Sequence, residues 1–108
     1  MYVENKTISA TDLGGGVTRK VLAYSDNLMS VELHFEKGAV GAKHSHPHEQ
    51  IGYIISGSLS YQEEGKEDQV LTAGDTYYVA PNVVHGIVAL EETMLLDIFT
   101  PMRKDFVK

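Results

Sequence analysis

Short runs of residues with two-residue alternation, separated by turn residues, constrain the fold of this chain most strongly. The runs are rich in Val, Ile, Tyr, Thr and Phe, and no window of about 11 residues or more has a clean helical period. They cover residues 17–24, 30–36, 50–55, 59–63, 69–72, 76–79, 85–89 and 93–100. Many short strands between frequent turns predict an all-β sandwich or barrel, which also hides its strand edges.

The length of 108 residues fits one domain, which we expect to span residues 1–108. The apolar runs are far shorter than the ~20 residues of a transmembrane helix, and the first residues show no signal-peptide pattern, so we expect a cytoplasmic protein. A net charge of −6, without a Lys/Arg-rich stretch, argues against nucleic acid and membrane partners. The absence of Cys excludes disulfides, thiolate metal sites and a Cys nucleophile.

Three of the five histidines cluster at positions 44, 46 and 48. Residues two apart on a strand point to the same face, so His44 and His46 would present two imidazoles to one metal ion. Gln50 can add a neutral carbonyl ligand, and His85 stands near the start of a later strand. The alternatives are surface or packing roles for these histidines, and for Gln50 a hydrogen-bonding role away from the metal.

The two remaining histidines are not counted among the ligands. His48 follows Pro47, which is expected to break the strand, so we interpret His48 as a residue at the rim of the site. His34 lies in a separate run, and we interpret it as a strand residue in the barrel or at its surface.

Two segments around these residues resemble the paired motifs of the cupin family. Residues 38–57 match the first motif, G-x5-H-x-H-x(3–4)-E-x6-G, at every spacing, with Gln50 in the place of Glu. Residues 74–89 are similar to the second motif, G-x5-P-x-G-x2-H-x3-N, and depart from it at Ala80, Asn82 and Ala89. The resemblance implies a double-stranded β-helix, or jelly roll, a fold that hosts many functions.

Three imidazoles and an amide are all neutral, so an ion held by them keeps its full charge. Such a site favours an anionic oxygen ligand, such as a carboxylate or an enolate. It stabilises a trivalent ion poorly, which makes oxygen-activating chemistry less favoured. The ligand set suits one divalent transition metal, and the sequence does not choose among Ni, Zn, Fe, Mn and Cu.

The last strand carries the candidate for proton transfer. Alternation places Asp97 on one face with Leu95 and Phe99. If this face points into the barrel, burial raises the pKa of Asp97 while a metal lowers it, so its protonation can be tuned for acid–base work. The alternative for Asp97 is a structural buried carboxylate.

Three other kinds of residue near this strand have open roles. Phe99 is either a pocket wall or a core residue. Arg103 either binds a substrate carboxylate or is a surface charge. The tyrosines are interpreted as sheet residues.

Residues 21–106 are similar to the small cupins of the pectin-degradation type, which linearise 4,5-unsaturated monouronates released by pectin and alginate lyases. The resemblance implies a small anionic sugar-derived substrate and, since small cupins are often dimers, a homodimer. The roles that it implies are metal ligation by His44, His46, Gln50 and His85, acid–base catalysis by Asp97, and substrate contacts from Phe99 and Arg103.

Two other functions stay open at this point. One is a metal-dependent cupin dioxygenase or isomerase that acts on a small carbonyl compound. The other is a non-catalytic cupin that binds a sugar or an acid. A carboxylate beside the metal favours an enzyme, because proton transfer needs such a group and simple binding has little use for it.

Overall fold

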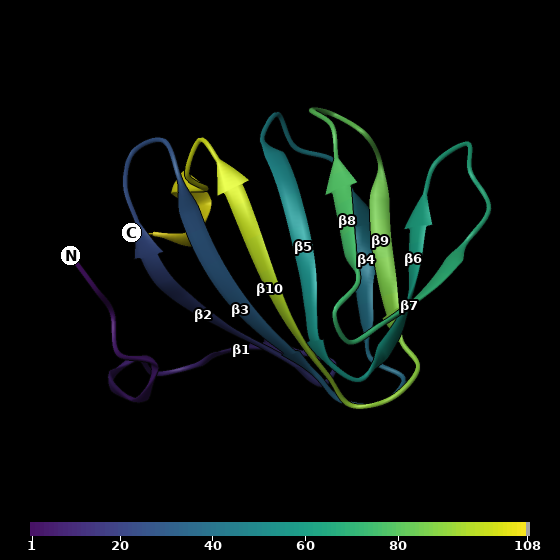
Figure 1. Cartoon of the computed structure of the whole chain (residues 1–108), viewed down its shortest axis with the longest axis horizontal. Helices are drawn as coiled ribbons and strands as arrows, with labels where there is room; N and C mark the ends of the chain where they lie inside the picture. The colour runs from purple at the N-terminus through teal and green to yellow at the C-terminus, as the bar shows by residue number, and fades with distance from the viewer. Residues whose placement is uncertain (108) are drawn as a thin grey trace.

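The computed structural model describes residues 1–107, which form two antiparallel sheets that lean against each other (Figure 1). The six-stranded sheet has the order β1-β2-β3-β10-β5-β8, and the four-stranded sheet has the order β4-β9-β6-β7. The all-β prediction is therefore confirmed. No helix in the described part of the chain is long and apolar enough to cross a membrane.

The elements are short, as the spacing of the turn residues predicts. They are η1 (Asn5–Thr7), β1 (Thr11–Gly14), β2 (Val17–Tyr24), β3 (Met29–Phe35), β4 (Val40–His44), β5 (Glu49–Ser56), β6 (Ser58–Glu63), β7 (Gln69–Thr72), β8 (Thr76–Val79), β9 (His85–Ala89), β10 (Thr93–Thr100) and η2 (Lys104–Phe106), where η marks a single turn of 3-10 helix.

Every run named above forms a strand, and two further strands lie outside those runs; one of them, β4, corresponds to the strand assumed for His44 and His46 but ends at His44. The first is β1, a short and exposed edge strand that offers little apolar alternation. The second is β4, whose start overlaps a glycine-rich stretch that reads as a turn. Its pairing with β9 is irregular between Gly41 and His44 and its residues are mostly exposed, which explains why the pattern hides it.

The core lies between the sheets, on the inward faces of alternating strands. In β10 every second residue from Thr93 to Phe99 is buried, so the face that Asp97 was predicted to share with Leu95 and Phe99 points inward. The main cluster comprises Val17, Phe35, Ala39, Ile54, Leu59, Tyr61, Tyr77, Val79, Ile87, Ala89 and Leu95.

A second apolar cluster anchors the end of the chain. Met29, Val31 and Phe99 are buried there, and Met102 and Phe106 pack against them. The segment after β10 therefore turns back onto the six-stranded sheet, as Figure 1 shows for the yellow turn beside β3 and β10. This packing brings the C-terminal residues to the pocket described below.

Candidate metal centre

Three histidines converge at one end of the space between the sheets. His44 ends β4, and it pairs in register with His85, the first residue of β9. His46 lies in the loop between β4 and β5. Their candidate ligand nitrogens all lie within 4.8 Å of one another, a spacing that fits a single metal ion. We call these three residues and Gln50 the histidine centre.

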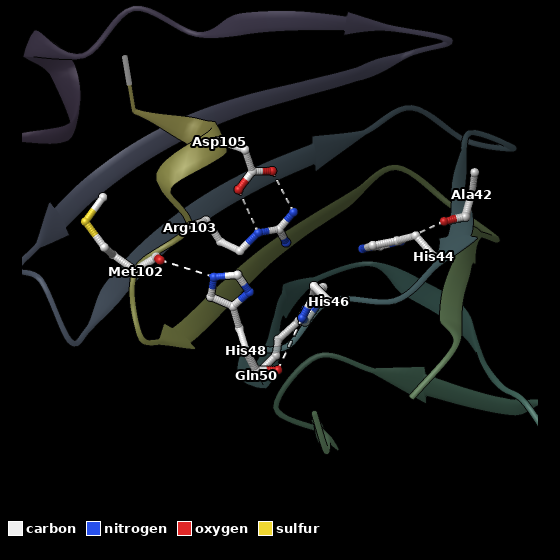
Figure 2. Close-up of polar contacts among 8 residues, drawn as sticks. All are labelled: Ala42, His44, His46, His48, Gln50, Met102, Arg103 and Asp105. Carbon is white, nitrogen blue, oxygen red and sulfur yellow. Dashed lines mark hydrogen bonds and ion pairs between the residues drawn. The ribbon is translucent and has the colours of Figure 1, made fainter. Parts of the chain in front are cut away.

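Each imidazole of the histidine centre is held through Nδ1 by a nearby backbone carbonyl. The carbonyl oxygen two residues away lies at 2.9 Å for His44, 3.2 Å for His46 and 2.9 Å for His85. Figure 2 shows this contact between His44 and Ala42. Donation from Nδ1 leaves a lone pair on Nε2, which is the tautomer that ligates a metal, and it also fixes the orientation of the ring.

The unused polar atoms of the centre fit a bound cation. The Nε2 of His85 is buried and has no hydrogen-bond partner among the described residues. His46 Nε2 lies 2.9 Å from Gln50 Oε1, although its Nδ1 already faces a carbonyl. A neutral imidazole donates from one nitrogen only, so two acceptors face each other here. A metal ion that accepts both lone pairs removes this conflict.

Burial favours the neutral form of His46 and His85. It lowers the pKa of His46 to about 4, with a further contribution from the charge of Arg103. The pKa of His85 is also lowered, again mainly by burial. At pH 7 these two rings therefore do not need to lose a proton before they bind a metal.

A loop, and not the strand alternation that the sequence suggests, places His46 at the centre. Strand β4 ends at His44, so the expectation that both histidines project from one strand is wrong. The loop that carries His46 is held by the backbone N–H of Asn82, which donates to the His46 carbonyl at 2.8 Å. Asn82 has a φ of 66°, a left-handed conformation that Asn tolerates and that explains its place where the cupin motif has Gly.

Beside the centre, Asp97 accepts a hydrogen bond across two strands. The Tyr77 hydroxyl of β8 donates to Asp97 Oδ1 of β10 at 3.0 Å, and both side chains are buried. Gly52 of β5 is paired with both residues and lies between them. A Cβ at Gly52 would lie 2.2 Å from the Tyr77 ring, so the absence of a side chain there makes the contact possible.

Asp97 combines burial with several stabilising contacts. Burial raises the pKa of Asp97 to about 6, against the opposing effect of hydrogen bonds from Gln50 and Tyr77 and of the Arg103 charge. Gln50 directs Oε1 at His46 Nε2, and its amide also favours the ionised form of Asp97. Gln50 thus connects the histidine centre to the one candidate for proton transfer.

A pocket of about 320 Å³ joins these groups. Its lining includes Phe99, whose ring also packs against His46 at 5.6 Å between centroids, so Phe99 is a pocket wall and a core residue at once. Arg103 lines the same pocket and is only 9% exposed, so the alternative of a surface charge is wrong. Its Nε and Nη2 donate to the Asp105 carboxylate at 3.1 and 2.9 Å (Figure 2).

The other two histidines stand apart from the cluster of ligand atoms. His48 Nε2 lies 3.2 Å from the Met102 carbonyl, so this residue ties the loop after β4 to the C-terminal segment (Figure 2). That position agrees with a residue at the rim of the site. His34 pairs with Glu92 at 3.2 Å, partly exposed and away from the pocket.

Comparison with known proteins agrees with this geometry. A family model described as "Cupin domain" matches residues 31–99. The chain belongs to the cupin family. The pectin degradation protein KdgF of Dickeya dadantii (strain 3937) is 46% identical over 98 residues, covering 89% of this chain and 88% of that protein. The oxalate decarboxylase OxdC of Bacillus subtilis (strain 168) is 36% identical over 87 residues, which are 72% of this chain and 22% of that protein.

Solved cupin structures superpose on almost the whole chain. KdgF from Halomonas sp. has a TM-score of 0.94 at 36% identity, covering 99% of this chain and 98% of that structure. An RmlC-like cupin from Shewanella frigidimarina NCIMB 400 has a TM-score of 0.93 at 39% identity, covering 98% and 95%. The predicted jelly roll and the resemblance to pectin-degradation cupins are confirmed.

Sequence reasoning missed two polar residues of this cupin pocket. Tyr77 was expected to be an ordinary sheet residue, because a tyrosine in a strand gives no sign of the carboxylate that it meets. Arg19 also lines the pocket. A usable signal existed for Arg19, since alternation places it on the same face of its strand as Val17 and Val21.

Proposed function

We propose that this cupin is a metal-dependent enzyme that converts 4,5-unsaturated monouronates to their linear keto forms. The single observation that carries the proposal is the buried Asp97, which faces a pocket shared with the histidine centre. The similarity to two KdgF proteins supports pectin degradation as the context. A solely sugar-binding protein has little need of a buried carboxylate beside a metal site.

The proposed reaction is an isomerisation and needs no co-reactant. The substrate is a cyclic hemiacetal whose ring oxygen is attached to a C4=C5 double bond conjugated to a carboxylate. Loss of the proton from the anomeric hydroxyl forms the C1 carbonyl, breaks the bond from C1 to the ring oxygen and releases an enolate at C5. A proton delivered to C4 then gives the open-chain keto acid, so one proton leaves and one returns.

Asp97 is proposed to move this proton as base and then as acid. Its pKa near 6 lies close to neutral pH, where a carboxyl group can exchange a proton in both directions. The Tyr77 hydroxyl donates to Asp97 Oδ1, which orients the carboxylate for the proton transfer. Phe99 forms an apolar wall at the same pocket, where it can pack against the face of the sugar.

The metal is proposed to be held by His44, His46, His85 and the carbonyl oxygen of Gln50. When bound, a divalent ion supplies Lewis-acid stabilisation of the negative charge that develops on a substrate oxygen. The neutral ligands suit this task because the substrate itself brings the negative charge. Buried Arg103 adds a fixed positive charge to the pocket and is proposed to contact the substrate.

The test is the disappearance of the ultraviolet band of the conjugated double bond. The metal-loaded protein is incubated with the unsaturated monouronate from a pectin or alginate lyase digest, and the decay is compared with buffer. We expect a faster decay with protein and a loss of that acceleration in Asp97→Asn, which keeps the size of the side chain but removes the base. Asp68→Asn, at an exposed position outside the pocket lining, serves as the control for a lost acidic charge.

Two results contradict the proposal. Decay at the buffer rate with metal-loaded protein excludes linearisation of this substrate. Full acceleration by Asp97→Asn excludes Asp97 as the acid–base group. Oxygen uptake during turnover of a candidate substrate would instead favour a cupin dioxygenase.

A further inference from the structure

Arg19 lies on the inward face of β2, where an apolar side chain would be expected. Its neighbours on that face are Val17 and Val21, and its register partner on β3 is Leu33 of the core. A guanidinium placed among such residues needs a reason, because burial of a charge without compensation is unfavourable. Arg19 is half-buried and lines the pocket.

Within residues 1–107, Arg19 has no ion-pair partner and makes no side-chain hydrogen bond, whereas the neighbouring Lys20 contacts Asn5. The charged residues among those lining the pocket are Arg19, Arg103 and Asp97. Arg103 is paired with Asp105, so Arg19 is the positively charged residue of the lining that has no counter-ion within residues 1–107. A small anion bound in the pocket would balance this charge, and a focused positive field in a cleft attracts such ligands.

Phe106 brings the two guanidiniums together. The Cζ atom of Arg19 lies 4.1 Å from the centroid of the Phe106 ring, and that of Arg103 lies 4.3 Å from it. The two charges are therefore separated by no more than the sum of these distances. Cation–π contacts stabilise and orient both groups without neutralising them. We call Arg19, Arg103 and Phe106 the arginine wall.

Arg103 alone offers an incomplete site for a carboxylate. Its Nε and Nη2 are engaged by Asp105, so the edge that usually forms a two-pronged contact is occupied. Its Nη1 makes no hydrogen bond within residues 1–107. A carboxylate in the pocket has two oxygens, and Arg19 can supply the donors for the second one.

We infer that Arg19 is a substrate-binding residue and that the arginine wall binds the carboxylate of a small sugar acid. The identity of the ligand as a uronate rests on the proposed function, whereas the binding of a carboxylate does not require turnover. The alternative for Arg19 is a purely structural contact with Phe106. The two roles differ in an observable way, because only substrate binding makes Arg19 discriminate an acid from the corresponding neutral sugar.

The first experiment measures binding without metal and without turnover. Metal-free protein is titrated with galacturonate and with neutral galactose, and amide shifts are followed by two-dimensional NMR. We expect saturable shifts with galacturonate only, and a dissociation constant at least roughly tenfold higher for Arg19→Met, equivalent to about 1.4 kcal/mol. Met keeps an apolar stem against Phe106, and a matching amide spectrum shows that the variant is folded.

The matched control is Lys20→Met, which removes one positive charge from the adjacent, outward-facing position of β2. We expect this variant to bind galacturonate as the unmodified protein does. Equal affinity of Arg19→Met and Lys20→Met overturns the inference, as does an absence of galacturonate binding by the unmodified protein. Arg19→Lys keeps the charge, so we expect a smaller loss than for Arg19→Met.

The second experiment separates this inference from the proposed function. With the unsaturated monouronate, we expect Arg19→Met to raise KM roughly tenfold and to change kcat by less than about threefold, since uniform binding is what it loses. An unchanged KM in an active protein overturns the role of Arg19 and leaves the proposed function standing. An inactive unmodified protein rejects the proposed function, and the NMR titration then decides on Arg19 by itself.

Discussion

The histidine centre and the arginine wall, although they share one pocket, are held by different kinds of contact. Each imidazole is oriented by a backbone carbonyl only two residues away in the sequence. The arginine wall instead joins β2 to the end of the chain through the Phe106 ring. The segment that carries Arg103 and Phe106 is also held by the contact of His48 with the Met102 carbonyl, which spans 54 residues.

This difference suggests how each part responds to change. The carbonyls that orient His44 and His85 lie outside the C-terminal segment, and the His46 contact reaches that segment only through His48. The arginine wall includes two residues of the C-terminal segment. Loosening of that segment should therefore weaken anion binding more than it weakens metal binding. Three substitutions test this separation between the two parts.

The largest effect is expected for His85→Ala. This change removes a buried ligand nitrogen and leaves two imidazoles, so we expect metal affinity to fall at least roughly a hundredfold, beyond the effect typical of supporting residues. Metal content after reloading and dialysis measures it. His34→Ala is the control, because His34 pairs with Glu92 away from the pocket. Full metal content in His85→Ala would show that the histidine centre does not bind the ion as proposed.

Gly52→Ala is expected to have an intermediate effect. It changes the contact between Tyr77 and Asp97, which belong neither to the histidine centre nor to the arginine wall. The added methyl group would lie 2.2 Å from the Tyr77 ring, so Tyr77 must move away from Asp97. We expect a loss of about 1–3 kcal/mol in the free energy of unfolding, which is typical of overpacking. Denaturant unfolding measures this loss. Activity should fall as well, because Asp97 loses its donor.

A second substitution checks the cause of the Gly52→Ala effect. Shortening the clashing side chain with Tyr77→Leu makes room for the added methyl group. The two losses of stability should therefore sum to more than the loss in the double variant. Simple additivity would show that the clash with Tyr77 is not the reason for the lost stability.

His48→Phe is expected to have the smallest effect. It keeps a ring against Phe99 but removes the contact with the Met102 carbonyl, so the C-terminal segment is held less firmly. A typical net hydrogen bond of about 1 kcal/mol corresponds to a rise of roughly fivefold in the dissociation constant for galacturonate. His34→Phe is the matched control. If His48→Phe lost metal but bound galacturonate unchanged, the expectation that the C-terminal segment supports mainly anion binding would be wrong.

The sequence predicted the bounds of several strands well. Residues 17–24 and 93–100 were both expected to be strands, and both have these bounds in the structure. The strand assumed for His44 and His46 was not given its bounds, because the β4 ladder is irregular and begins within a glycine-rich stretch. The candidate ligands were found through their spacing, but the reason given for His46 was wrong, since a loop and not the strand positions it.

The sequence alone also left the surroundings of Asp97 open. Alternation predicted its face correctly, because that depends only on the pleat of one strand. The hydrogen bond that Asp97 accepts from Tyr77 depends on the order of three strands and on the absence of a side chain at Gly52. Such an arrangement joins residues that no local pattern relates, so it cannot be read from any single segment.

Local chemistry thus determined the strand pattern, the face that Asp97 shares with Leu95 and Phe99, and the set of neutral candidate ligands, since each follows from residue type and short spacing. The packing of distant segments decided the contacts between residues that lie far apart in the sequence. It buries Arg103, for which the sequence had left a surface position open, and it places Arg19 and Arg103 against the same Phe106 ring. The physical reason is that side-chain contacts across sheets depend on strand order and register, which sequence separation does not encode.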